Sequence, residues 1–171
     1  PHVTSVWHPA FYRRDRTGVK SPKLYIGAYE ASNNGGTVSS DATTATRYAT
    51  SWTGLKLTSK SGVAPLTGNG TSGTLAQFET AANLVGSNWG IQSFWTQCLL
   101  QSLFYIEYAS LNSQSALAPG ITNASAALDT GAGNALMGTN GTGGGTDQQA
   151  VCYRGIENPW GNIWKFIIGF N

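Results

Sequence analysis

Charged side chains are scarce in this chain. Asp, Glu, Lys and Arg supply 11% of its 171 residues, against about 25% in ordinary soluble domains. Gly, Ser, Thr, Asn and Ala take their place. The formal net charge of +2 is too small to indicate a nucleic-acid partner. This neutral, polar composition is more typical of β-rich extracellular or virion proteins than of cytosolic enzymes.

The sequence also lacks long apolar runs and clusters of metal-binding residues. No stretch reaches the ~18 apolar residues that a membrane span needs, and the start shows no signal-peptide pattern. Cys98 and Cys152 are the only cysteines, and we expect them to be free, buried thiols; the alternative is a single disulfide between them. His2 and His8 stand too near one end to suggest a zinc site or a Ser/His/Asp set. We therefore predict no catalytic residue, no metal and no cofactor.

The length fits one domain with a proper core. Hydrophobic residues make up 40% of the chain and aromatic residues 11%, which is a globular composition. No Pro-rich or charged linker divides the sequence, so residues 1–171 are predicted to form a single domain. Because the first residue is Pro1 rather than Met, the chain is expected to be a processed product or an excerpt.

Helical periodicity is confined to the middle of the chain. Residues 74–85 are predicted as a short helix, with Thr74 as its cap and Gly86 at its end. A longer helix is predicted from Ser93 to about Ser113. It is apolar over most of its circumference, so we expect it to be buried on more than one side. Its only acid, Glu107, is expected either to pair with Arg154 or to be solvated.

Strands and loops account for the remainder. Residues 3–12 and 23–29 are predicted to pair as a hairpin, and residues 47–52 and 55–57 to be short extended pieces. The other residues of 31–73 are rich in Ser, Thr, Gly and Asn and are predicted as loop. A second long excursion, rich in glycine, starts at Ala118 and runs to Gly145. It is either functional or a solvated flap.

The last twenty residues contain an unusually aromatic turn. Trp160 and Trp164 stand four residues apart around Gly161 and Asn162. Such a turn is either anchored in a core or presented as a binding platform, and we favour the core, filled by Trp160 or Trp164. Gly161 permits a left-handed backbone, and the Asn162 side chain can bond to its own turn.

The order of these segments resembles the C-type-lectin-like fold in its formylglycine-generating-enzyme, or sulfatase-modifying-factor, variant. Residues 161–166, Gly-Asn-Ile-Trp-Lys-Phe, resemble the family's G-N-[VI]-W-E-W segment. Residues 86–92 resemble its G-x-x-W-x-L-x-T passage into the second helix, and residues 153–155 a core strand. The opening, 7–11 with 25–30, resembles the H-P-A-F … I-Y-I-G-K-Y-E pattern of bacteriophage virion proteins of this fold. The residues that would form the structural signature are Trp89, Arg154, Gly155, Trp160, Gly161, Asn162 and Trp164.

The resemblance implies an α+β architecture: two helices packed on small twisted antiparallel sheets with long Gly/Ser/Thr/Asn-rich loops. In the enzyme-like relatives the Asn and Glu of the turn help to hold calcium. Here Lys165 occupies the Glu position, and a cation there would oppose a divalent ion. The paired redox cysteines of the enzyme are also missing. An enzyme is therefore not expected, and a formylglycine-generating-type oxidase is the least favoured function.

The expected function is that of a virion structural surface protein, such as a tail-fibre, head-fibre or decoration component. It would present residues 31–51 and 118–149 for adhesion to a host surface glycan or protein. Its partners would be other virion proteins and further copies in a homo-oligomer, with neither nucleic acid nor a membrane span. The alternative is a purely structural subunit-locking protein with no ligand. The candidate ligand-binding residues are Tyr48, Trp52, Asn134, Asn140 and Asp147.

Overall fold

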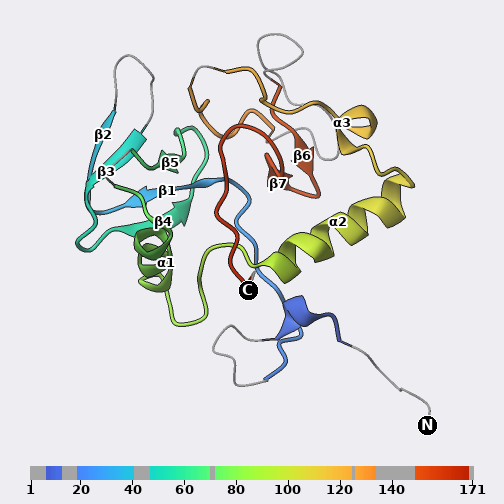
Figure 1. Ribbon diagram of the computed structural model, residues 1–171, viewed down its shortest axis with the longest axis horizontal. Helices are drawn as coiled ribbons and strands as arrows, with labels where there is room; N and C mark the ends of the chain where they lie inside the picture. The colour runs from blue at the N-terminus through green and yellow to red at the C-terminus, as the bar shows by residue number, and fades with distance from the viewer. Residues whose placement is uncertain are drawn as a thin grey trace.

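The computed structural model describes residues 7–12, 19–40, 47–69, 72–124, 126–133 and 149–169. The chain is α+β, as the sequence predicts (Figure 1). Its elements are η1 (Pro9–Phe11), β1 (Ala31–Asn34), β2 (Thr37–Ser40), β3 (Arg47–Ser51), β4 (Lys56–Ser59), β5 (Leu66–Thr67), α1 (Leu75–Asn83), α2 (Phe94–Tyr108), α3 (Ser113–Ala116), β6 (Cys152–Tyr153) and β7 (Ile156–Glu157).

The described strands form three small sheets. β1 pairs with β4 antiparallel, and β6 with β7 antiparallel. β3 lies between β2, its antiparallel partner, and β5, its parallel partner. In Figure 1, β1 to β5 and α1 occupy one side of the molecule and α2, α3 and the β6–β7 hairpin the other, with the C-terminal segment between them. The mixed pairing of β3 departs from the expected purely antiparallel sheets.

Each side has its own hydrophobic core. The cluster under β3 and α1 contains the buried residues Ala49, Leu55, Leu66, Phe78 and Ala81. The cluster under α2 contains Phe104, Leu117, Ala118, Val151 and Tyr153, with the half-buried Trp160 packed against it. The second cluster thus joins α2 to two stretches of chain, one before residues 134–148 in the sequence and one after them.

The shorter predicted helix is confirmed from its cap onward, although it ends at Asn83, before the predicted end at Gly86. Thr74 caps α1 by accepting a hydrogen bond from the Gln77 amide, and the Gln77 side chain accepts one from the Thr74 amide. This reciprocal capping box satisfies amides that the first helical turn leaves without partners. Phe78, Ala81 and Ala82 face the core.

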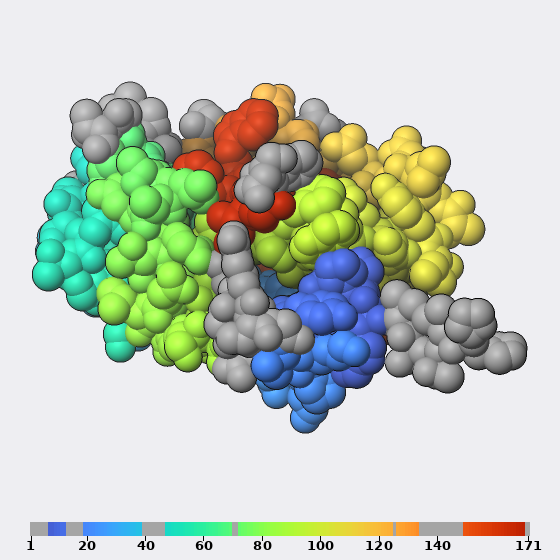
Figure 2. Space-filling model, turned by 60° about the horizontal axis from the view of Figure 1, so that its bottom comes forward, coloured from blue at the N-terminus to red at the C-terminus, as the bar shows by residue number. Residues whose placement is uncertain are grey.

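The longer helix differs from its prediction in length and in burial. α2 begins after its cap, Ser93, but ends at Tyr108, because Ala109 adopts a left-handed conformation with φ of 48°. Only Thr96 and Phe104 of α2 are buried, and Trp95 and Ile106 are 46% and 80% exposed. The prediction of burial on more than one side is therefore wrong. In Figure 2, the yellow-green side chains of α2 reach the surface between the N-terminal segment in blue and the C-terminal segment in red.

The predicted N-terminal hairpin is wrong for the described part of residues 3–12 and 23–29. Pro9 begins the short helix η1, with the His8 side chain as its cap, and one isolated bridge joins Tyr12 to Lys20. The fixed φ of proline favours the first turn of a helix over a strand interior. Residues 23–29 contain no strand. Strand β1 forms instead in the Ser/Asn-rich segment, where β4 supplies its partner.

The structure confirms two smaller predictions. Cys98 and Cys152 are free, although only Cys152 is buried. Arg154 and Glu107 form an ion pair, with 2.9 Å between Nε and Oε2. None of the described helices combines the length and the apolar character that crossing a bilayer requires.

The two tryptophans of the C-terminal turn have opposite environments. The Trp160 ring lies 5.9 Å from that of Phe104 on α2, and its Nε1 donates to the Ala118 carbonyl over 3.1 Å. Trp164 is 100% exposed. The turn thus packs against the central helix as predicted, but Trp164 does not fill the core as a structural residue would.

Trp160→Ala and Trp164→Ala form a matched pair. We expect Trp160→Ala to lower the free energy of unfolding by about 3 kcal/mol, because it leaves a cavity beside Phe104. Trp164→Ala should stay within about 0.5 kcal/mol of the wild type, because the side chain has no core contacts to lose. Urea unfolding followed by far-UV circular dichroism measures both. Equal losses in the two variants would contradict this placement of the turn.

Candidate functional site

Two buried carboxylates, Glu30 and Glu157, organise the centre of the molecule. Both residues are less than a tenth exposed. Within the described ranges, no three His, Cys, Asp or Glu side chains gather as a metal centre would need. Because a buried charge is costly unless it is paired or hydrogen-bonded, the partners of these two groups reveal what each one does.

Glu30 lies directly before β1 and meets three side chains from the C-terminal part of the chain. Its Oε2 accepts hydrogen bonds from the Nδ2 atoms of Asn158, over 3.3 Å, and Asn162, over 2.5 Å. Lys165 Nζ lies 2.7 Å from Oε1 as an ion pair. We call this set, Glu30 with Asn158, Asn162 and Lys165, the Glu30 network.

Burial and pairing act in opposite directions on Glu30. Removal from water raises the pKa of its carboxyl above the ordinary value of 4.5 and is the largest effect. The Lys165 ammonium and the two asparagine donors pull the pKa down, but by less. The ionised carboxylate therefore remains costly to bury even with its partners in place.

The turn does not fit a divalent cation. Ca²⁺ takes about 6–8 oxygen ligands, whereas the Lys165 ammonium already lies against Glu30 Oε1 and donates to the Gly161 carbonyl over 3.0 Å. The Lys165 ammonium thus supplies the positive charge that these two oxygens contact. As the lysine at position 165 predicts, a cation of the chain lies at this turn and would repel a divalent ion.

Asn162 connects the Glu30 network to the glycine-rich excursion. Its Oδ1 accepts from the Leu128 amide over 2.8 Å, and its Nδ2 also donates to the Leu128 carbonyl over 3.2 Å. Its own amide donates to the Ile121 carbonyl over 2.8 Å. Gly161, with φ of +82°, makes this approach possible, because a Cβ there would lie 2.8 Å from the Ile121 nitrogen.

Glu157 anchors the far part of the same excursion. Its two carboxylate oxygens accept hydrogen bonds from the amides of Gly131 and Gly133, each over 2.7 Å. Such charge-assisted bonds are stronger than those between neutral groups. Thr130 adds a hydrogen bond from its Oγ1 to the Lys60 carbonyl over 2.6 Å. The described residues up to 133 are therefore held by hydrogen bonds to β7 and to the chain after β4, which a solvated flap would lack.

The structure separates the predicted ligand-binding residues. Asn134, Asn140 and Asp147 lie outside the described residues. Tyr48 and Trp52 are half-buried, the first on β3 and the second just after it. The Trp52 ring lies 4.9 Å from that of Phe78, and its Nε1 donates to Ser72 Oγ over 2.7 Å. Trp52 thus has a packing role, which leaves Tyr48 as the more available of the two.

The predicted structural residues also divide into groups. Arg154 and Gly155, with φ of 52° and 79°, form the two-residue turn between β6 and β7, as a type I′ hairpin requires. Trp89 is 46% exposed. The Arg154 guanidinium bonded to Glu107 lowers the pKa of that carboxyl and raises the pKa of the arginine. This pair, unlike the buried glutamates, is exposed to solvent.

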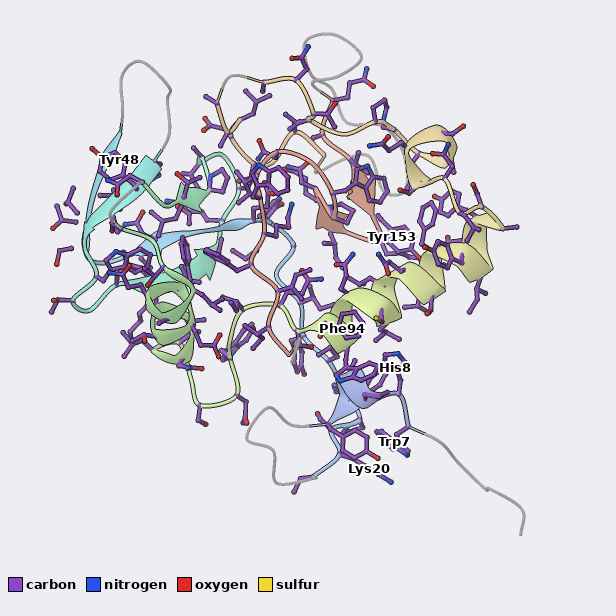
Figure 3. All side chains as sticks on the ribbon, viewed as in Figure 1. Trp7, His8, Lys20, Tyr48, Phe94 and Tyr153 are labelled. Atoms are coloured by element: carbon purple, nitrogen blue, oxygen red, sulfur yellow. The ribbon has the colours of Figure 1, made fainter. Side chains whose placement is uncertain are left out.

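Figure 3 shows two aromatic groups beside the central helix. Near its start, the His8 ring lies 6.4 Å from that of Trp95, while Lys20 Nζ lies 5.6 Å from the centre of the Trp7 ring. Near its other end, Tyr153 packs edge-on against Phe104, and burial raises the pKa of its hydroxyl. Lys20 thus makes a local cation–π contact with Trp7.

Sequence reasoning missed the Glu30 network. Glu30 and Asn162 are 132 residues apart, and no spacing rule connects positions so distant. The available signal was the type of residue: a glutamate directly before a polar strand, one asparagine just before the aromatic turn, and another between its two tryptophans. These carboxylates hold chain segments in place, so the arrangement supports a scaffold that positions the residues around it.

Glu157→Gln tests the anchoring of the excursion. The amide replaces one acceptor oxygen with a donor, which leaves the Gly131 or Gly133 amide without its partner. We expect a loss of about 1–3 kcal/mol in the free energy of unfolding and faster hydrogen exchange at those amides. Glu107→Gln is the matched control and should change neither quantity appreciably, because its ion pair is exposed. Unchanged exchange in Glu157→Gln would refute the anchoring role.

The pH dependence of stability tests the environment of Glu30. A carboxyl whose pKa is raised on folding binds its proton more readily in the folded state, so its ionisation costs stability. We expect the wild type to gain stability relative to Glu30→Gln as pH falls from 7 through the raised pKa to 4.5. Chemical unfolding of both proteins across this range measures the difference. A wild type that loses stability relative to the variant would mean that pairing with Lys165 outweighs burial.

No protein-family model matches the chain, and no curated protein or solved structure is found to match it. The α+β class therefore stands on the structure itself. The lectin-like family and the virion role stand on the residues alone and are taken up as proposals.

Proposed function

We propose that this chain is a structural protein of a virion surface, a tail-fibre, head-fibre or decoration component of C-type-lectin-like fold. Its loops would attach the particle to a host surface glycan or protein, and it would act without catalysis, metal or cofactor. Copies of the chain would assemble as a homo-oligomer beside other virion proteins, without nucleic acid.

The observation that carries this proposal is the anchoring of the glycine-rich excursion. Asn162 holds it at Leu128, and Glu157 holds it at Gly131 and Gly133, directly before residues 134–148. Recognition by loops requires a rigid base beneath them, because an unanchored loop loses more entropy on binding. The buried carboxylates supply that base for the segment that holds three of the five candidate binding residues.

The composition supports a role at a surface exposed to other molecules. The low proportion of charged residues leaves Ser, Thr, Asn and Gly to make contacts. Short polar side chains of this kind provide adaptable hydrogen bonding in binding loops. The fully exposed Trp164 adds an aromatic ring to the surface. An exposed ring with a polar edge is a common contact residue.

The second candidate is a purely structural protein that locks subunits together. The exposed apolar side chains of α2 favour it, because such surfaces mark contacts between proteins. The two candidates differ in where residues 134–148 would lie in the assembled particle, at its surface or between subunits. Limited proteolysis of intact particles distinguishes them, since only an exposed loop is cut.

Binding assays with a loop variant test the adhesion role. Asn134→Ala, Asn140→Ala and Asp147→Ala combined should lower binding to host cells or to a glycan array at least tenfold, with unchanged unfolding behaviour. The matched control combines Asn83→Ala and Ser87→Ala, two exposed polar residues at the end of α1 and in the connector after it, and should bind like the wild type. If replacing residues 134–148 with a short Gly/Ser linker leaves binding intact, the adhesion role fails.

A further inference from the structure

The outward face of α2 is apolar and open to solvent. Trp95 and Leu103 are each 46% exposed, Tyr105 is 41% exposed and Ile106 is 80% exposed. The inward face holds Phe104, which packs on Tyr153 and Trp160. A helix of a single folded unit normally turns its apolar side to the core and its polar side to water. Here both sides are apolar.

The spacing on the outward face is that of a helix–helix contact. Trp95, Leu99, Ser102 and Ile106 follow one another at intervals of four, three and four residues. This is the alternation of a coiled-coil seam, in which large side chains enter gaps between those of the facing helix. Ser102, small and exposed, stands at its centre and would allow two backbones to approach. We call these four residues the α2 seam.

The charges around the seam exclude several kinds of occupant. From Phe94 to Tyr108, Glu107 is the only charged residue, and Arg154 already pairs with it. Helices that lie on membranes carry lysines and arginines along their polar face, and α2 has none. A charged protein partner would likewise meet no complementary group here. An uncharged apolar face fits, and a second α2 offers one without repulsion between like charges.

The exposed area is of the size that self-association needs. At about 150–250 Å² per large side chain, the exposed fractions of Trp95, Leu103, Tyr105 and Ile106 correspond to roughly 400 Å² of apolar surface. A standard interface buries about 800 Å² on each partner, of which about 65% is apolar in homodimers. Helix α2 alone would supply most of that apolar share, and η1, which packs beside Trp95 through His8, would extend it.

We propose that the α2 seam is the self-association surface of this protein, on which the α2 seam of a second copy packs about a symmetry axis. This deepens the homo-oligomeric assembly in the proposed function, on which it rests for the identity of the partner. It explains why a helix already packed through Phe104 keeps a second apolar face. The α2 seam contains none of the candidate ligand-binding residues, so assembly and adhesion would have separate determinants.

Sedimentation of the intact chain tests the seam. The wild type should form a discrete oligomer, and Ile106→Lys should weaken self-association at least a hundredfold, because it places a charge in an apolar contact. Circular dichroism should show an unchanged fold, since the side chain is 80% exposed. Leu84→Lys is the control: Leu84 is 44% exposed at the end of α1, on the other side of the molecule, and its replacement should leave the oligomer intact. A monomeric wild type, or an Ile106→Lys variant that associates as tightly, overturns the proposal.

Cross-linking tests the geometry. In a Cys98→Ala background, Ser102→Cys should give a disulfide-linked dimer under mild oxidation whether the two helices run parallel or antiparallel, because position 102 lies near the middle of the seam. Gln101→Cys, also exposed but off the seam, should cross-link far less. Equal yields, or none, overturn the proposal. If the oligomer cross-links as expected but does not bind host cells, that result counts against the adhesion role alone.

Discussion

The structure depends on the burial of one carboxylate, that of Glu30. Its partners, Asn158, Asn162 and Lys165, come from the last part of the chain, whereas Glu30 itself leads into β1. A buried, ionised group cannot remain without partners, so it holds the C-terminal turn in place. Once the turn is fixed, Trp160 reaches Phe104 on α2 and completes the second hydrophobic core.

The same network extends to the long glycine-rich excursion and so to the proposed function. Asn162 bonds to the Glu30 carboxylate and to the backbone of Leu128, while Glu157 holds the amides of Gly131 and Gly133. Residues 134–148 therefore follow a fixed base. Helix α2 turns apolar side chains to the solvent. The proposed adhesion and assembly surfaces thus rest on a common scaffold but on different residues.

Local patterns in the sequence predicted local structure well and distant contacts poorly. The 74–85 helix is confirmed because its capping box and apolar spacing are contained in one segment. The end of α2 was missed because Ala109 adopts a left-handed conformation that alanine rarely takes. The prediction of an N-terminal hairpin is wrong because β propensity favours an extended segment but does not determine which strand it would pair with. Glu30 was missed because its partners lie more than 120 residues away, where no periodicity reaches.

The most direct test of this account is a double-mutant cycle on Glu30 and Asn162. The free energies of unfolding of Glu30→Ala, Asn162→Ala and the double variant are compared with that of the wild type. If the buried carboxylate holds the turn through Asn162, the double variant will lose about 1–3 kcal/mol less stability than the sum of the two single losses. Losses that add to within about 0.5 kcal/mol would show that the two groups act independently, and the account would be wrong.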